Sequence, residues 1–339
     1  MSQQLKSFQE AVSFAGGAVE TADHGALQVV IGDIRHDVGL LTAGTVFPRD
    51  AKMLVWSAMD IRNGGRVPVV AAEVVSEGAR EFLRSQRVGY SDAGGSLFLP
   101  LDGAFVLVDK AAPKREKRVV RSALSGKTSL VAHVLLTTDK SLKGVDISAM
   151  TGLSLGGVSA ALDKLERMGW LVTERSGATK LRSIGDRRGL LEQWKLARTA
   201  EGPVRKERFY VPGVSGASAL ARRISEVAAV EGIPYMVTGP YGAQMHAPYL
   251  SSISQVVCRI LDPDMERIAS ALGARRVNEG WNMGLVSSEI PMETPFLSEM
   301  NGILVASPSV CWIDTIAEAG RARELADHLA SERMIPSSA

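Results

Sequence analysis

Asp92 and the segment Val108-Asp109-Lys110 come nearest, by type and spacing, to a hydrolytic metal site. A metal-dependent nuclease needs carboxylates on neighbouring strands to hold Mg²⁺. Val108 stands where the second carboxylate is required, and Asp109 should point to the opposite face of its strand because side chains alternate along a strand. We therefore expect no nuclease activity, and keep a nuclease that uses Asp92 and Lys110 as an alternative.

Residues 237–243, VTGPYGA, and the strand that follows have the outline of a nucleotidyltransferase: a strand, a glycine turn, a helix and a second strand. In such an enzyme the second strand carries paired aspartates that bind Mg²⁺. Here it reads SISQVVCRI over residues 252–260 and contains no acidic residue. We expect this fold, if present, to be a scaffold without transfer activity.

Other catalytic patterns do not fit the chain. The segment RSALSGKT, residues 121–128, ends like a phosphate-binding loop, but Arg121 replaces the first glycine and a cationic run precedes it where a buried strand is needed. The five histidines and two cysteines lack the spacing of metal ligands, and no G-x-S-x-G sequence occurs. The sequence predicts no catalytic residue, no metal site and no cofactor.

The composition is that of a folded protein with more than one domain. The chain has 339 residues, 45% hydrophobic and 22% charged, which suggests about two or three domains. Its N-terminus lacks the basic flank and apolar core of a secretory signal, and prolines interrupt its longest uncharged stretch. Cys258 and Cys311 form no disulfide framework. We expect a cytoplasmic protein that does not enter the membrane.

Charge is distributed unevenly along the chain. Residues 110–208 carry 21 basic and 10 acidic residues, whereas the remainder carries 18 and 27. Because neutralisation of phosphates by Lys and Arg dominates nucleic-acid affinity, this asymmetry predicts that the centre binds a polyanion. A solvated basic linker is the alternative.

Residues 1–112 are expected to form one mixed α/β domain, because short apolar runs alternate with segments of helical period. The predicted strands are 27–34, 67–71, 88–91, 96–99 and 104–108, and the predicted helices are 49–61 and 78–87.

Residues 113–200 begin with the basic run and continue as a predicted winged helix-turn-helix. Gly152 occupies the turn, and Ser154 is a good N-cap for the helix that follows. In this architecture that helix enters the major groove and the wing lies along the backbone. The predicted helices are 128–136, 146–151 and 155–168, and the predicted wing strands are 170–174 and 179–184.

Three groups of residues are predicted to face DNA. The start of the recognition helix, Leu155 to Val158, offers few side chains for base contacts, so we expect specificity from Ser154, Ser159, the wing or DNA shape. The groups are Ser154, Ser159, Lys164 and Arg167 in the major groove, Arg175, Lys180 and Arg182 in the wing, and Lys114, Arg115, Lys117, Arg118, Arg121 and Lys127 on phosphates.

Residues 201–333 are predicted to form a further α/β domain, followed by a frayed tail over 334–339. A helix over 187–198 precedes this domain. Its predicted helices are 217–231, 265–272 and 316–331, and its predicted strands are 235–238 and 254–261.

Three segments resemble the AbiEi-like antitoxins of type IV toxin–antitoxin systems. They are EGAREFLRSQRVGYSDAGGSLFL (77–99), AMTGLSLGGVSAALDKLERMGWL (149–171) with RRGLLEQW (187–194), and NGILVASPSVCWIDTIAEAGRARELADHL (301–329), in which Asp314, Arg321 and Glu324 match. Gly95 and Ser96 replace the usual Gly-Asn, and Gly157 stands where such helices often carry Thr, so base contacts are not transferred there. The resemblance implies a repressor of its own operon, with inactive endonuclease-like and nucleotidyltransferase-like flanking domains.

The sequence thus predicts an α/β multidomain protein that is a double-stranded DNA-binding regulator, a repressor or antitoxin, and not an enzyme. A homodimer is expected because two-fold operators have two half-sites, and a cognate toxin is a further partner to consider. The alternatives are a metal-dependent nuclease or nucleotidyltransferase, and an architectural or plasmid-maintenance DNA binder with little sequence preference.

Overall fold

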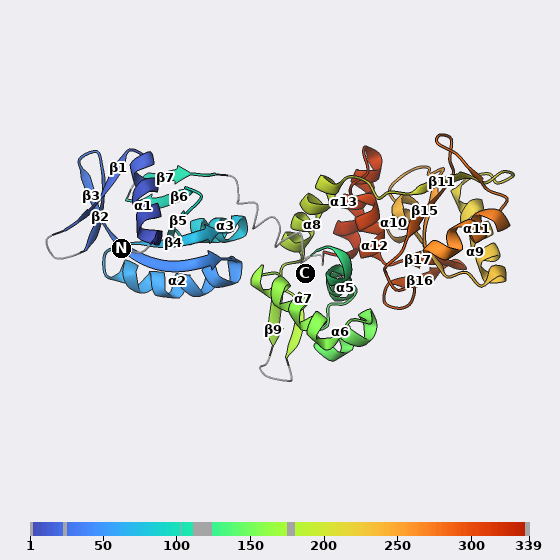
Figure 1. The fold of residues 1–339 in the computed structure, drawn as a ribbon, viewed down its shortest axis with the longest axis horizontal. Coiled ribbons are helices and arrows are strands. Elements are labelled where there is room, and N and C mark those ends of the chain that lie inside the picture. Colours follow the sequence, from blue (N-terminus) through green and yellow to red (C-terminus); the bar gives the residue numbers. More distant parts are fainter. Residues whose placement is uncertain (1–2, 23–25, 103, 111–123, 175–179, 336–339) are drawn as a thin grey trace. The chain divides into compact units, whose positions relative to one another are not determined.

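The computed structural model describes residues 3–22, 26–102, 104–110, 124–174 and 180–335 (Figure 1). The chain divides into two compact units, one comprising residues 1–120 with 163–169 and the other 121–162 with 170–339. Helices and sheets are mixed in both units, which confirms the predicted α/β class.

The first unit is built on a seven-stranded sheet whose strands follow the order of the sequence. Strands β3, β4 and β5 are parallel, and the outer pairs are antiparallel. Because parallel neighbours need a crossover, helices α2 and α3 connect them. The strands are β1 (Gly17–Thr21), β2 (Leu27–Ile31), β3 (Ile34–Val46), β4 (Val67–Val75), β5 (Gly89–Asp92), β6 (Leu97–Leu101) and β7 (Ala104–Val108), and the helices are α1 (Gln3–Phe14), α2 (Pro48–Asn63) and α3 (Glu77–Ser85).

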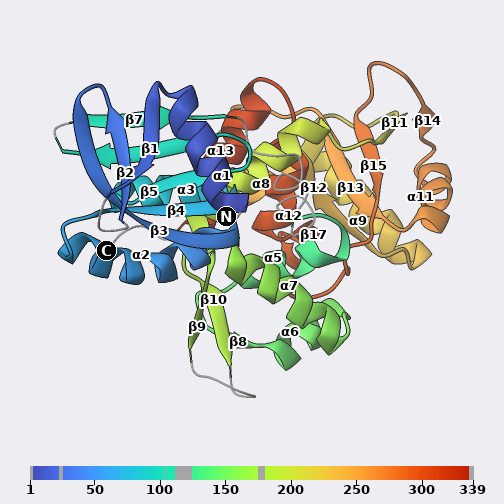
Figure 2. The ribbon, with the colours of Figure 1, turned by 60° about the vertical axis from the view of Figure 1, so that its left-hand side comes forward.

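Both faces of this sheet are covered. Alternate residues of β4 enter two separate cores, as expected for a strand buried on both sides. Val69 packs in the core that contains Phe8 of α1, and Val70 packs in the core that contains Leu83 of α3. Figure 2 shows α1 and α2 on opposite sides of the strands.

Two sequence predictions of local structure are wrong. The apolar run 27–34 is not one strand, because Gly32 (φ 59°) and Asp33 form the two-residue turn of the β2–β3 hairpin, with Ile31 opposite Ile34. The closing helix, predicted over 316–331, begins later, as α13 (Arg321–Arg333), because Gly320 precedes it with φ 61°; a further helix, α12 (Pro308–Thr315), was not predicted.

The N-terminal part of the second unit combines helices with a small sheet of strand order β8-β10-β9 (Figure 2). Helix α7 crosses the division, since its residues from 163 onward group with the first unit. The helices are α5 (Gly126–Leu136), α6 (Gly144–Thr151), α7 (Leu155–Arg167) and α8 (Arg187–Glu201), and the strands are β8 (Leu142–Lys143), β9 (Leu171–Glu174) and β10 (Leu181–Ile184).

The C-terminal part is a seven-stranded mixed sheet of order β14-β11-β15-β13-β12-β17-β16. Helices α10, α12 and α13 pack against one another. The strands are β11 (Glu207–Tyr210), β12 (Tyr235–Thr238), β13 (Val256–Ile260), β14 (Arg275–Arg276), β15 (Met283–Ser287), β16 (Leu297–Met300) and β17 (Ile303–Ala306), and the remaining helices are α9 (Ala217–Glu231), α10 (Gly239–His246) and α11 (Met265–Ala271).

Buried aromatic rings join the two parts of the second unit. Trp194 of α8 lies with its ring centroid 4.8 Å from that of His133 on α5 and 5.9 Å from that of Trp312 on α12. His133 Nδ1 lies 2.9 Å from Ser309 Oγ. These contacts fix helices α5 and α8 on α12.

Among the described residues, no single helix is long and apolar enough to cross a membrane. Helices α6 and α7 reach that length and composition only when taken together across a 113° bend.

Candidate nucleic-acid interface

Helices α6 and α7 form a bent pair joined by three residues. Gly152 ends α6 with φ 68°, in the left-handed region that glycine adopts without steric cost. Ser154 Oγ accepts a hydrogen bond from Gly157 N at 3.2 Å, which confirms the predicted cap. The 113° bend lies within the range of about 90–120° typical of a helix-turn-helix.

One side of α7 is buried and its first turn is exposed. Val158, Ala161 and Leu162 are at most 2% exposed and recur at helical spacing. Leu155, in contrast, is 57% exposed, and Ser159 also lies at the surface. The beginning of α7 is therefore accessible to a partner.

In the three-stranded sheet, Arg182 lies on the central strand and is buried, whereas a cation of the wing was expected to be exposed. Strand β10 pairs with both neighbours, with Arg182 opposite Thr173 of β9 and opposite Leu142 of β8. Its residue exposure is only 8%. Arg182 is therefore largely buried rather than an exposed cation of the wing, and its contact with DNA stays a prediction.

Arg182 is one of the residues that line a pocket of 480 Å³, which we call the Arg182 pocket. Among the described residues, its lining includes three cations and no carboxylate. The Nε atom of Arg182 is buried and has no hydrogen-bond partner among the residues that the structure describes. The lining residues are Lys143, Gly144, Val145, Leu155, Ser159, Leu162, Lys180 and Arg182.

The remaining predicted DNA-facing residues do not all gather around this pocket. Lys164 is half-buried and Arg167 is exposed in the last turn of α7. Lys143, which the sequence analysis missed, belongs to the pocket because β8 pairs with β10. Arg175 and the cations Lys114, Arg115, Lys117, Arg118 and Arg121 lie outside the described residues.

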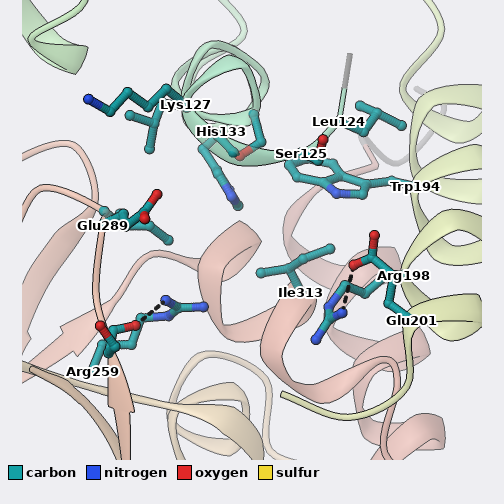
Figure 3. Close-up of a pocket in the computed structure, with 15 residues that line it drawn as sticks. Leu124, Ser125, Lys127, His133, Trp194, Arg198, Glu201, Arg259, Glu289 and Ile313 are labelled. Atoms are coloured by element: carbon teal, nitrogen blue, oxygen red, sulfur yellow. Dashed lines mark hydrogen bonds and ion pairs between the residues drawn. The ribbon is translucent and has the colours of Figure 1, made fainter. Parts of the chain in front are cut away.

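Lys127 lies at a different cavity, of 370 Å³, bounded by α5, α8, α12 and the residues after β15. In Figure 3 the side chain of Lys127 points away from the centre of this cavity, whereas the ring of His133 points towards it. The arginines of this cavity are already paired, Arg198 with Glu201 at 2.9 Å and Arg259 with Asp314. Burial lowers the pKa of His133 to about 3, with a smaller contribution from Arg259, so the ring is neutral at pH 7.

In the first unit, the carboxylate of Asp92 is held by protein groups. Arg80 is 3% exposed, and its guanidinium donates to Asp92 at 2.7 Å and to Asp109 at 2.8 Å. The other oxygen of Asp92 accepts from Ser96 N at 3.1 Å. A cation of the chain itself therefore holds Asp92, the carboxylate that the nuclease alternative would use, and Asp109 reaches the same guanidinium although it was expected to point to the opposite face of its strand.

A second buried ion pair lies in the C-terminal sheet. Arg259 of β13 donates to Asp314 of α12 at 2.7 and 2.5 Å, and Thr238 Oγ1 donates to the same carboxylate at 2.7 Å. Burial disfavours the charged form of Arg259, but Asp314 more than offsets this and raises the pKa of the guanidinium. The strand that would carry catalytic aspartates in a nucleotidyltransferase thus presents an arginine engaged by a carboxylate.

Comparisons of this chain with protein-family models, with curated proteins and with solved structures give no match.

Proposed function

We infer that this chain is a double-stranded DNA-binding transcriptional regulator whose α7 reads the major groove and whose β9–β10 hairpin follows the phosphate backbone. The observation that carries this proposal is the α6–α7 pair. It has the three-residue turn, the glycine and the interhelical bend of a helix-turn-helix, and its second helix begins at the surface.

The order of elements adds support. Helix α5, strand β8, helices α6 and α7, and the β9–β10 pair follow one another as in a winged helix-turn-helix. The excess of basic residues over 110–208 supplies the phosphate neutralisation that such binding requires. Regulation of its own operon, a toxin partner and a cytoplasmic location belong to this proposal through the resemblance to AbiEi-like antitoxins, and a homodimer belongs to it because two-fold operators have two half-sites.

We also assign non-catalytic roles to the flanking domains. We assign the first unit as endonuclease-like, and in it Arg80 donates hydrogen bonds to both Asp92 and Asp109. In the nucleotidyltransferase-like assignment of the C-terminal sheet, Arg259 and Asp314 engage each other. Both ion pairs are structural, which favours a regulator over an enzyme.

Selection from a pool of random duplexes tests the function. The purified chain should enrich a single motif, with two related halves if it acts as a dimer. Recovery of duplexes without a shared motif would favour an architectural DNA binder. Recovery of no duplex, together with Mg²⁺-dependent cleavage or nucleotidyl transfer, would favour an enzyme.

A further inference from the structure

We propose that the Arg182 pocket binds one phosphate group of the DNA backbone, an inference that rests on the DNA-binding function proposed above. The pocket is formed by residues from β8, α6, α7 and β10 together with Lys180. It is separate from the cavity in Figure 3, whose arginines are paired with carboxylates.

The charge of the pocket selects an anion. Lys143, Lys180 and Arg182 contribute three positive charges, and no acidic side chain of the described part of the chain lines the cavity. Asp146, the nearest acidic residue along α6, instead accepts a hydrogen bond from Lys143 N at 3.3 Å. Apolar walls from Val145 and Leu162 lower the local dielectric, which strengthens attraction to an anion that enters.

The unsatisfied donor points to an oxygen-bearing ligand. Buried N–H groups are almost always hydrogen-bonded, because leaving one without a partner costs free energy. Arg182 is more than nine-tenths buried, and its Nε–H group has no hydrogen-bond acceptor among the described residues. A phosphate oxygen would supply the missing acceptor, and guanidinium and phosphate match in charge and geometry.

The location of the pocket gives the phosphate a positioning role. Leu155 and Ser159 from the first two turns of α7 line its wall, so a phosphate held there lies beside the part of the helix that reaches bases. Contacts to phosphates set the register of a protein on the duplex without reading sequence. Arg182 would therefore set where α7 enters the groove.

The test compares Arg182→Gln with wild type on a selected duplex and on a scrambled one, over a series of salt concentrations. Arg222→Gln, which removes an exposed arginine of α9, is the matched control for loss of charge. We expect Arg182→Gln to weaken binding to both duplexes by roughly tenfold to a hundredfold and to reduce the slope of log K against log salt by about one. Arg182→Lys should retain most of the slope, and circular dichroism confirms folding of each variant.

Inorganic phosphate provides an arm that does not depend on DNA. At matched ionic strength, phosphate should raise the melting temperature of wild type and of Arg222→Gln more than that of Arg182→Gln. If wild type binds DNA and Arg182→Gln binds it equally well with an unchanged slope, the inference is overturned while the DNA-binding function stands. If wild type binds no duplex, the DNA-binding function fails and with it the DNA phosphate; a phosphate effect that needs Arg182 would then identify a site for free phosphate.

Discussion

The Arg80–Asp92 ion pair makes the structural role of Asp92 measurable as a contribution to the stability of the first unit. Arg80 is 3% exposed and pairs with two carboxylates of unequal burial: the side chain of Asp92 is 0% exposed and that of Asp109 is 51% exposed. Asp92→Ala leaves the buried guanidinium with a half-exposed partner, whereas Asp109→Ala leaves the buried pair intact. The two variants should therefore differ strongly in stability.

The expected magnitudes follow from this difference in burial. Removing one partner of a buried ion pair costs about 3–5 kcal/mol, so Asp92→Ala should lower the free energy of unfolding of the first unit by about 3 kcal/mol. Solvent screens the contact with Asp109, so Asp109→Ala should cost about 1 kcal/mol or less. The value for Asp92→Ala lies at the lower end because Asp109 and the carbonyl oxygens of Val75 and Lys110 still accept from Arg80.

Hydrogen–deuterium exchange of the full chain, read on peptides from β4 and β5, reports the first unit separately from the rest. A loss of about 3 kcal/mol corresponds to more than a hundredfold increase in the opening equilibrium. The double variant Arg80→Met/Asp92→Leu removes both buried charges and should recover most of the protection. Equal effects of Asp92→Ala and Asp109→Ala, or no effect of either, would refute the structural role of Asp92.

Four further outcomes are expected. Because the pKa of His133 is lowered to about 3 in the folded protein, the unfolded chain binds more protons as the pH falls below about 6.5. The free energy of unfolding should therefore fall by about 2 kcal/mol between pH 7 and pH 5. In urea titrations, His133→Asn should flatten this pH dependence. Asp314→Asn should destabilise the C-terminal sheet by about 3 kcal/mol or more, seen as raised exchange in β12 and β13, because it leaves Arg259 buried without its carboxylate. Ser154→Ala should lower stability by about 1 kcal/mol in chemical denaturation through loss of the α7 cap, whereas an unchanged midpoint would show that the cap contributes little. Arg182→Met should raise the melting temperature, because it removes a buried donor without a partner; a lower value would show that the guanidinium stabilises the free protein.

Local signals in the sequence predicted the helix pair well. Gly152 and Ser154 specify where α6 ends and α7 begins through steric freedom and side-chain capping, which depend on the immediate neighbours alone. The turn at Gly32 was missed because apolar residues on both sides of it extend one strand-like run.

Long-range contacts account for the rest. The sequence around Arg182 predicts a cation of the wing, and it does not show that the two-residue strand β8 pairs with β10. No local pattern predicts that Lys143 lines the same pocket as Arg182. Asp314 meets Arg259 across 55 positions of sequence. Such pairs depend on which elements pack together, and a single sequence carries no direct signal of that packing.

Sequence-specific DNA binding is tested by fluorescence anisotropy of the purified chain at about 150 mM salt. The measurement compares duplex DNA from upstream of its own gene with a scrambled duplex of equal length. A sequence-specific regulator should prefer the native duplex by about a thousandfold or more. Equal weak binding to the two duplexes, or no binding to either, would contradict this function.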